Sequence, residues 1–165
     1  MCIRDSPYWP IRGQKIISIW VPFDNVSKET GAVEYIQGSH KWNKMFAPTS
    51  FGKETKFSDL YDKMGLEKIP DIDSNKDNYD IISWDVKPGD IILHHPLVLH
   101  SSSGNSSSAK RRRGLALRYV GEDVVWDGRE GTFMKNEKIQ KLLPPINLND
   151  GDVLTSELFP VIWQH

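Results

Sequence analysis

Three histidines, a serine-rich loop and an arginine cluster follow one another between residues 93 and 119, in the sequence LHHPLVLHSSSGNSSSAKRRRGLALRY. Imidazole is a common metal ligand, and a guanidinium binds a carboxylate through two parallel hydrogen bonds. The order of these residues therefore indicates one of two sites. One is a metal site with an arginine that anchors an anion, and the other is a basic loop that contacts nucleic acid.

The histidines differ in what their positions predict. His100 stands where an apolar run gives way to a polar loop, a common position for a functional side chain. Taken alone, such a histidine is more often hydrogen-bonded at a strand end than bound to a metal. His94 and His95 are adjacent, so on a strand they point to opposite faces and at most one can face a barrel interior.

The arginine cluster leads into an apolar run that is typical of a strand. Alternation places four residues on one face of it: Arg112, Gly114, Ala116 and Arg118. The small residues leave room for a ligand beside the guanidinium of Arg112. A solvated basic cluster is the alternative. The whole chain has 21 Lys and Arg against 22 Asp and Glu, a balance that argues against a nucleic-acid partner.

Several short strands must position these side chains. Strands are predicted over residues 15–23, 32–40, 79–86, 91–100 and 114–121, and a short helix over 56–65. The turn-forming sequence DNVSKETG predicts that the first two strands pair as a hairpin. Pro96 predicts either a break within the fourth, which would make it two short strands, or an edge position for it. Ser39 and His40 end the second strand, where they either face the site or make the turn. This pattern favours a mainly β sandwich or barrel with few helices.

The totals limit the class of protein. A chain of 165 residues with 10% aromatic residues fits one packed domain. Its single cysteine, Cys2, excludes an internal disulfide framework. No apolar run approaches the roughly 20 residues of a membrane span, and the first residues lack the apolar region of a secretory signal. We therefore expect no membrane partner and a cytoplasmic location.

The ordered motifs resemble the phytanoyl-CoA dioxygenase-like family of Fe(II)- and 2-oxoglutarate-dependent oxygenases. The resemblance rests on the sequences DSPYWP, SIWVPFDNVSKETGAVEYIQGSHKW, VKPGDIILHHPLVLHSSSGN and RRRGLALRY, which span residues 5 to about 123. It implies a double-stranded β-helix, a jelly-roll or cupin-like barrel. The nearest alternative on the same fold is a non-catalytic ligand-binding barrel that has lost its iron site.

The resemblance also implies site residues. The family holds iron with a His-x-Asp pair and a distal histidine, which match Asp5 and His100. Arg112 matches the arginine that binds the far carboxylate of 2-oxoglutarate, with Arg111 as the alternative one residue earlier. Ser102 is expected to hydrogen-bond 2-oxoglutarate, and Trp20 to lie near it.

One position departs from the family pattern. The histidine of the His-x-Asp pair falls on residue 3, which is Ile3, and isoleucine cannot bind iron. The first five residues, MCIRD, resemble the translation of a transposase-end sequencing adapter found at the start of metagenomic gene fragments. Residues 1–5 are therefore expected to be non-native, and residues 6–165 to be the C-terminal part of a single dioxygenase barrel domain, incomplete at its N-terminus.

The function that the resemblance implies is a dioxygenase reaction. With iron and 2-oxoglutarate as cofactor and co-substrate, such an enzyme hydroxylates a C–H bond of a small-molecule substrate and releases succinate and CO2. The identity of that substrate, the oligomeric state and the pathway are not readable from the sequence.

Overall fold

The computed structural model describes residues 2–42, 44–47, 58–63 and 65–163. The chain forms two compact units, Met1–Pro7 with Ile17–Tyr119, and Tyr8–Ile16 with Val120–His165. Each unit is described by itself. The assignment of residues 6–165 to one domain stays a prediction.

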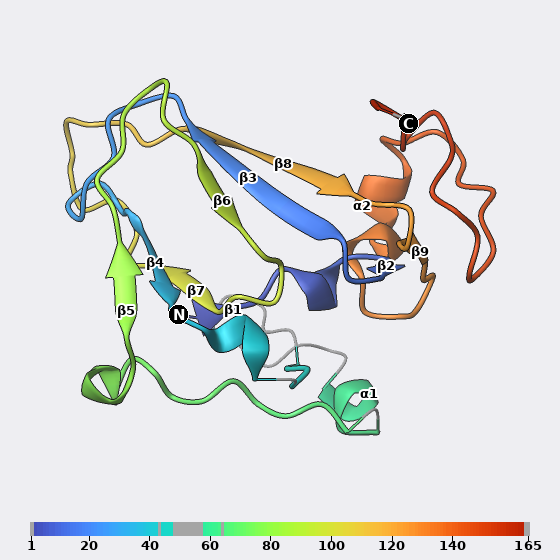
Figure 1. The fold of residues 1–165 in the computed structure, drawn as a ribbon, viewed down its shortest axis with the longest axis horizontal. Helices are drawn as coiled ribbons and strands as arrows, with labels where there is room; N and C mark the ends of the chain where they lie inside the picture. The colour runs from blue at the N-terminus through green and yellow to red at the C-terminus, as the bar shows by residue number, and fades with distance from the viewer. Residues whose placement is uncertain (1, 43, 48–57, 64, 164–165) are drawn as a thin grey trace. The chain divides into compact units, whose positions relative to one another are not determined.

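The first unit contains a four-stranded antiparallel sheet. Its strand order is β1 (Cys2–Ile3), β7 (His100–Ser102), β4 (Val33–Ile36) and β5 (Ile81–Ser83) (Figure 1). Residues Ile3, His100 and Tyr35 stand opposite one another across β1, β7 and β4. Because directly opposed residues project to the same side of a sheet, these three side chains form one row.

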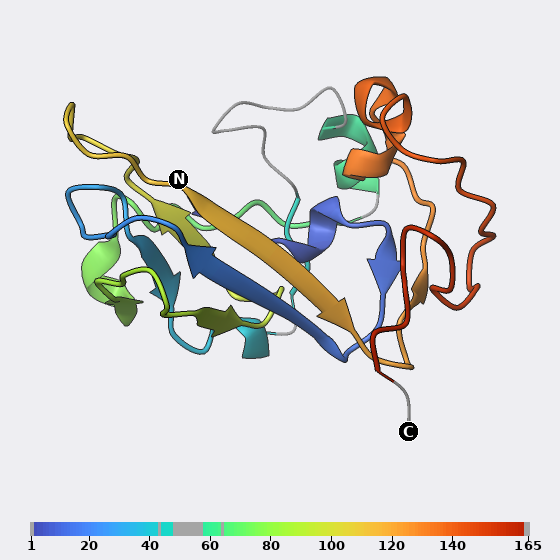
Figure 2. The same ribbon diagram turned by 90° about the horizontal axis from the view of Figure 1, so that it is seen from above.

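A three-stranded sheet carries the longest strands. Its order is β6 (Ile92–His94), β3 (Ile16–Pro22) and β8 (Gly114–Val120), and Figure 2 shows β8 in orange running beside β3 in blue. On β3, Ile16 and Ser18 are buried whereas Ile17 between them is exposed, which is the alternation of a half-buried strand. Ser18 stands opposite His94 in the β3–β6 register.

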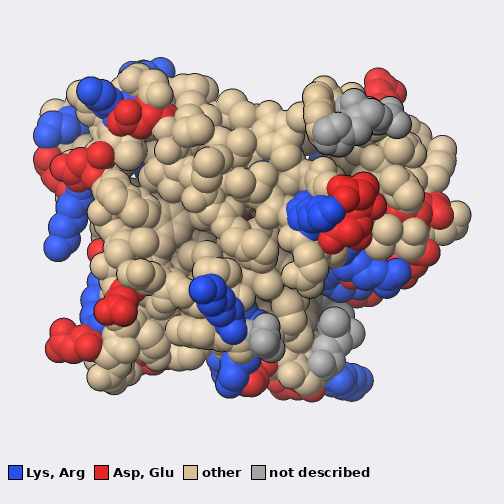
Figure 3. All heavy atoms as spheres, viewed as in Figure 1, with Lys and Arg blue, Asp and Glu red and all other residues tan. Residues whose placement is uncertain are grey.

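The outward face of this sheet is apolar. Ile17, Leu93 and Leu115 are exposed there, one from each of the three strands. In the view of Figure 3, the surface over β3 and β6 consists of uncharged residues, and the charged side chains lie around it. The inward face of the same strands carries the polar residues. Polar side chains therefore face the interior here and apolar side chains face solvent, the opposite of the usual distribution.

The strands confirm the predicted mainly β fold with few short helices, but one predicted pairing is wrong. Residues 15–23 and 32–40 do form strands, β3 and β4, yet these strands belong to different sheets. The connection between them crosses from one sheet to the other. The turn-forming sequence was compatible with a hairpin, but the pairing of β3 with β6 and β8 overrides it.

The predicted break at Pro96 is confirmed. β6 ends at His94 and β7 begins at His100, and a tight turn joins them, in which the N–H of Val98 donates to the carbonyl of His95 at 2.9 Å. Proline fits the second position of such a turn because its φ is already set. Of the one or two short strands predicted over residues 91–100, the structure therefore has two.

The remaining elements of the first unit are short helices. They are η2 (Ser39–Lys41), η3 (Lys76–Asn78) and α1 (Ser58–Lys63), the last of which confirms the predicted helix. Residues 56, 57 and 64 of that prediction lie outside the described residues. η1 (Ser6–Tyr8) follows β1 and begins in this unit.

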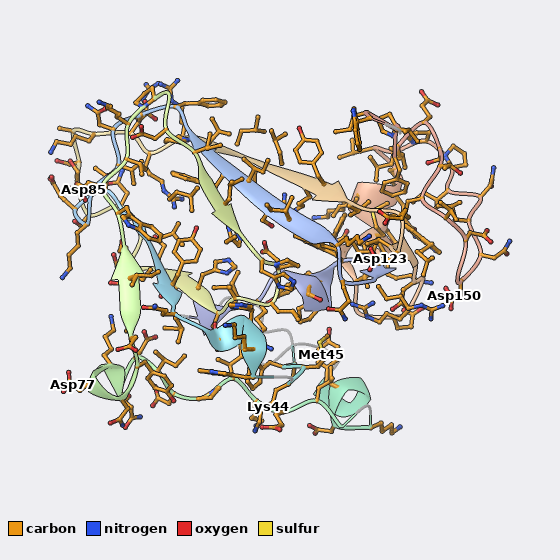
Figure 4. The ribbon with its side chains drawn as sticks, viewed as in Figure 1. Lys44, Met45, Asp77, Asp85, Asp123 and Asp150 are labelled. Atoms are coloured by element: carbon orange, nitrogen blue, oxygen red, sulfur yellow. The ribbon has the colours of Figure 1, made fainter. Side chains whose placement is uncertain are left out.

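The second unit has its own core around a two-stranded sheet. β2 (Ile11–Arg12) pairs with β9 (Val125–Trp126), and η4 (Phe133–Lys135) and α2 (Glu137–Gln140) follow. Its buried hydrophobic cluster consists of Trp9, Ile16, Val124, Trp126, Met134 and Leu154. Two carboxylates, both labelled in Figure 4, close its loops: Asp123 accepts the N–H of Gln14 at 2.7 Å, and Asp150 accepts that of Gly128 at 2.7 Å.

Within the described ranges, no helix has the length and apolar character needed to cross a membrane.

A buried hydrophobic cluster packs at the start of strand β7. Ile36, Phe46, Ile72 and Leu99 are buried together, and Leu99 is 0% exposed. The N–H of Leu99 also donates to the Ser39 hydroxyl at 2.8 Å, and that hydroxyl donates to the carbonyl of Ile36 at 2.7 Å. Leu99 therefore joins β7 to the end of β4 through both packing and hydrogen bonding.

We expect Leu99→Ala to lower the free energy of unfolding of the first unit by about 2–5 kcal/mol, because it removes a fully buried side chain and leaves a cavity. Urea denaturation followed by tryptophan fluorescence measures the change. The matched control is Leu93→Ala, where the side chain is 54% exposed, and its effect should stay within about 0.5 kcal/mol. Equal effects of the two substitutions would contradict this account of the core.

Candidate metal centre

A cavity of about 530 Å³ lies within the first unit, between the inward faces of its two sheets. The four-stranded sheet and the segment after β1 contribute Ile3, Asp5, Val33, Tyr35, His100, Ser101 and Ser102. The three-stranded sheet and the segment before β8 contribute Ser18, Ile19, Trp20, His94, Arg112, Ala116 and Arg118. Most of the polar groups that the sequence singled out therefore meet in one place.

Three of these side chains form a group with the composition of a metal site. One ligand atom from each of Asp5, His94 and His100 lies within 4.8 Å of the others. Nε2 of His94 is 3.3 Å from Oδ2 of Asp5, and Nε2 of His100 is 3.7 Å from Oδ1. Two imidazoles and one carboxylate that point at one another can hold a divalent transition metal.

Backbone hydrogen bonds fix the position of Asp5. Its N–H donates to the carbonyl of Pro96 at 3.1 Å, and the N–H of Ser6 donates to the same oxygen at 3.3 Å. The turn between β6 and β7 thus holds Asp5 close to the two strands that carry the histidines. The Ser18 hydroxyl, from the neighbouring strand β3, donates to Oδ2 of Asp5 at 3.0 Å.

His100 is held in the orientation that a metal ligand needs. Its Nδ1 lies 3.1 Å from the carbonyl of Val98, and because a carbonyl only accepts, Nδ1 carries the proton. The lone pair is therefore on Nε2, which faces Asp5. Burial lowers the pKa of His100 and outweighs the opposing effect of the Asp5 carboxylate, so the imidazole is neutral at pH 7 and available to a metal.

Asp5 is a carboxylate in this environment. Burial raises its pKa, but the hydrogen bond from His94, attraction to the protonated form of His100 at the low pH where a carboxylate titrates, and the hydrogen bond from Ser18 outweigh burial and leave the pKa below its usual value. The charged form is therefore the one present at neutral pH. His94 also has a buried Nδ1 that makes no hydrogen bond within the described part of the chain.

The register of β1 places residue 3 beside this group. Ile3 stands opposite His100, so its side chain projects into the same cavity. The position that the family pattern assigns to a histidine is therefore next to the metal group, although isoleucine occupies it. His94 brings a second imidazole from a different strand.

Tyr35 packs against both imidazoles. Its ring centroid is 5.3 Å from that of His94 and 5.9 Å from that of His100. Only 4% of Tyr35 is exposed, and burial, with a smaller effect of Asp5, raises the pKa of its hydroxyl to about 12. The phenol is therefore neutral, and it can donate a hydrogen bond inside the cavity.

Arg112 lies at the cavity with its guanidinium stacked on Trp20, 5.0 Å from the ring centroid. Gly114 permits this arrangement, because a Cβ there would lie 2.6 Å from the Trp20 ring. Nε of Arg112 is buried and makes no hydrogen bond to any described residue. The arginine is thus held by stacking at the wall of the cavity, and Arg111 is not among the lining residues.

Ser102, which was expected at the site, lies at the cavity, whereas Ser39 and His40, which could have faced the site or made a turn, do not line it. Ser102 lines the cavity, but its hydroxyl donates to the carbonyl of Gly31 at 2.9 Å and accepts the N–H of Gly104 at 3.2 Å. Its role toward 2-oxoglutarate stays a prediction. Ser39 makes the turn after β4, and His40 lies against the ring of His95, 5.8 Å between centroids, outside the cavity lining.

Three residues around the cavity were not identified from the sequence: His94, Ser18 and Tyr35. Of His94 and His95 it allowed that one could face the interior, and the structure selects His94. The signal that could have selected it is the register of β6 against β3, which is not encoded locally. Ser18 and Tyr35 alternate correctly for inward-facing positions on their strands, but nothing in their residue types distinguished them from core residues.

The comparison with family models decides the relationship. Residues 4–114 match the model described as Phytanoyl-CoA dioxygenase (PhyH), which is most of the chain. The chain belongs to the phytanoyl-CoA dioxygenase family. It is 24% identical over 134 residues to the human protein named phytanoyl-CoA dioxygenase, peroxisomal, and 24% identical over 123 residues to a probable phytanoyl-CoA dioxygenase of Caenorhabditis elegans. These alignments cover 81% and 73% of the chain but only 37% and 36% of the two relatives.

Solved structures show the same fold for this family member. The epimerase SnoN, in complex with Fe3+, alpha ketoglutarate and nogalamycin RO, superposes with a TM-score of 0.66 at 19% identity, over 97% of the chain and 56% of SnoN. The non-heme alpha ketoglutarate dependent carbocyclase SnoK superposes with a TM-score of 0.62 at 20% identity, over 97% of the chain and 54% of SnoK. The expected jelly-roll fold is thereby confirmed.

If the three side chains form a metal site, His94→Gln and His100→Gln should each lower the affinity for Co²⁺ by at least about 100-fold, since even residues behind the ligands commonly contribute 10–100-fold. Calorimetric titration with CoCl2 measures the affinity. His95→Asn is the matched control, because Asn can still accept the N–H of Leu97 that His95 accepts at 3.2 Å. The assignment would be contradicted if His95→Asn bound Co²⁺ as weakly as His94→Gln and His100→Gln do. It would also be contradicted if those two variants bound Co²⁺ as tightly as the unaltered protein.

Proposed function

We propose that this protein is an Fe(II)- and 2-oxoglutarate-dependent dioxygenase that hydroxylates a C–H bond of a small molecule, with release of succinate and CO2. The observation that carries the proposal is the convergence of Asp5, His94 and His100 on one cavity that Arg112 also lines. Membership of the phytanoyl-CoA dioxygenase family supports the same reaction. The chain spans about 37% of the length of the human relative, so the activity of the whole protein rests on this proposal.

The donor set fits iron(II). Two imidazoles and one carboxylate on one side of a metal leave its other positions open, which is the arrangement of non-heme iron oxygenases. Asp5, His94 and His100 would hold the ion, and the neutral His100 and charged Asp5 are already in the required protonation states. When bound, iron supplies the oxygen chemistry, whereas the protein binds, orients and encloses the reactants.

Arg112 is proposed to bind the far carboxylate of 2-oxoglutarate. A buried guanidinium nitrogen without a partner is costly, and a carboxylate would satisfy it through the bidentate pairing that arginine prefers. Trp20 holds the guanidinium plane in place by stacking. SnoN, which shares the fold, is described with alpha ketoglutarate bound, and this agrees with a co-substrate site in the same kind of barrel.

Tyr35 is proposed to complete the co-substrate site. Its hydroxyl is neutral, its ring contacts both imidazoles of the metal group, and it lines the cavity that Arg112 also lines. A neutral phenol there can donate to a carboxylate or carbonyl oxygen without adding charge. Ser102 is retained as a further contact at the cavity wall.

A non-catalytic barrel is the second candidate, and Ile3 is the observation that favours it. A metal held without a ligand from position 3 depends on His94, and a protein that had lost metal binding would tolerate isoleucine there. The two candidates differ in one property: only the dioxygenase converts 2-oxoglutarate to succinate.

We expect the protein with Fe(II), 2-oxoglutarate and air to form succinate slowly without added substrate, and a chelator to abolish it. Arg112→Gln should raise the 2-oxoglutarate concentration for half-maximal rate at least about 30-fold, since hydrogen bonds to charged groups contribute about 1.5–3 kcal/mol each. Succinate is quantified by NMR. Arg111→Gln should change that concentration less than twofold. If Arg111→Gln had the larger effect of the two, Arg111 rather than Arg112 would be the residue that binds 2-oxoglutarate. No succinate under any condition would favour the non-catalytic barrel.

Position 3 offers a gain-of-function test. Because Ile3 projects beside His100, Ile3→His should raise Co²⁺ affinity at least tenfold and make His94→Gln tolerable in the double variant. Ile3→Leu is the control for a change of side chain without a ligand. If Ile3→His changes affinity no more than Ile3→Leu, residue 3 does not lie within reach of the metal and the proposed arrangement is wrong.

A further inference from the structure

Ser18 lines the cavity beside the metal group, and the proposed reaction gives it no role. It lies on β3, only 2% of it is exposed, and its hydroxyl donates to Oδ2 of Asp5 at 3.0 Å. We infer that Ser18 is a positioning residue: by holding Oδ2 it leaves Oδ1 of Asp5 as the carboxylate oxygen that meets the metal. This inference rests on the proposed function, because it takes Asp5, His94 and His100 to be the ligands.

The Oδ1 atom of Asp5 faces an acceptor. It lies 3.7 Å from Nε2 of His100. Nδ1 of His100 carries the proton that it donates to the carbonyl of Val98, so Nε2 has a lone pair, and a carboxylate oxygen also only accepts. A neutral imidazole therefore places no proton between these two atoms, and a metal cation is the partner that suits both. Oδ1 thus faces the position where an ion would bind.

The Oδ2 atom is instead held by donors. The hydroxyl of Ser18 and Nε2 of His94 approach it at 3.0 and 3.3 Å. Ser18 and His94 stand opposite each other in the register of β3 and β6, so one cross-strand pair meets at this oxygen. Hydrogen bonds to an ionised carboxylate are stronger than neutral ones, so turning Oδ2 away from both donors has a cost.

Ser18 is the donor of this pair that can stay in place when a metal binds. To donate to Oδ2, Nε2 of His94 must carry a proton, because a carboxylate only accepts. To bind a metal, the same nitrogen must offer its lone pair. His94 cannot do both, so it releases Oδ2 when it becomes a ligand. The hydroxyl of Ser18 is under no such restriction and continues to fix the orientation of Asp5.

The number of carboxylate oxygens on the metal determines how many positions stay open. An octahedral ion held by two imidazole nitrogens and one carboxylate oxygen keeps about three positions for other ligands. A second carboxylate oxygen would occupy one of them. The proposed reaction needs these positions for its co-substrates. By holding Oδ2, Ser18 therefore keeps one more position of the metal available.

The test counts the water molecules on Mn²⁺ bound to the protein, from the relaxation of bulk water. Without 2-oxoglutarate, the unaltered protein should hold about three exchanging waters per ion. Ser18→Ala and Ser18→Cys both remove the strong donor, and each should lower the count by about one, because Oδ2 is then free to reach the metal. These two variants differ in size, so a loss common to both is not a packing effect. If one of them fails to fold, the other decides. Ser18→Thr keeps the hydroxyl and should keep the full count.

Ser83→Ala is the matched control. Its hydroxyl donates to the backbone carbonyl of Val33 at 3.0 Å rather than to a metal ligand, so this variant should keep the full count. The inference is wrong if the unaltered protein already holds only about two waters, or if Ser18→Ala and Ser18→Cys keep about three. It is also wrong if Ser83→Ala or Ser18→Thr loses a water as they do.

Failure of the proposed function has a different signature. The unaltered protein would then bind Mn²⁺ but form no succinate from 2-oxoglutarate with Fe(II). The water counts need no turnover, so they still decide the role of Ser18 in that case. An unaltered protein that binds no Mn²⁺ would contradict both the proposed function and the role of Ser18.

Discussion

The carboxylate of Asp5 is the point on which the site depends. It follows a two-residue strand, and the carbonyl of Pro96 holds its backbone against the turn between β6 and β7. One of its oxygens meets Ser18 and His94 from the three-stranded sheet, and the other faces His100 from the four-stranded sheet. A single charged group therefore connects the inward faces of both sheets. Without that charge, two partly buried imidazoles and a hydroxyl would lose their common partner.

A second constraint lies along β8. The Trp20 ring rests on Gly114 because no other residue lacks the Cβ that would collide with it, and the same ring supports the guanidinium of Arg112. Alternation then places Ala116 and Arg118 on the same inward face. Arg112, just before the strand, and Ala116 and Arg118 within it thus form one wall of the cavity.

Much of this could be predicted from the sequence, for identifiable reasons. Period-two alternation predicted the inward face of β8, and the change from apolar run to polar loop marked His100. The break at Pro96 followed from the fixed φ of proline. The pairing of strands was not predicted correctly. The turn sequence after β3 suggested a hairpin, yet β3 and β4 lie in different sheets. The role of His94 was undetermined for the same reason, because it depends on the register of β6 against β3, and no local pattern encodes that register.

The family relationship and the geometry agree on the kind of site but not on every ligand. The family pattern assigns a histidine to position 3, where this chain has isoleucine, and the structure brings His94 to the same group instead. The most direct measurement is anomalous diffraction from crystals grown with Co²⁺ and 2-oxoglutarate. The account predicts one strong anomalous peak within bonding distance of Asp5, His94 and His100, with the far carboxylate of 2-oxoglutarate on Arg112. A peak elsewhere, or none in crystals saturated with Co²⁺, would contradict it.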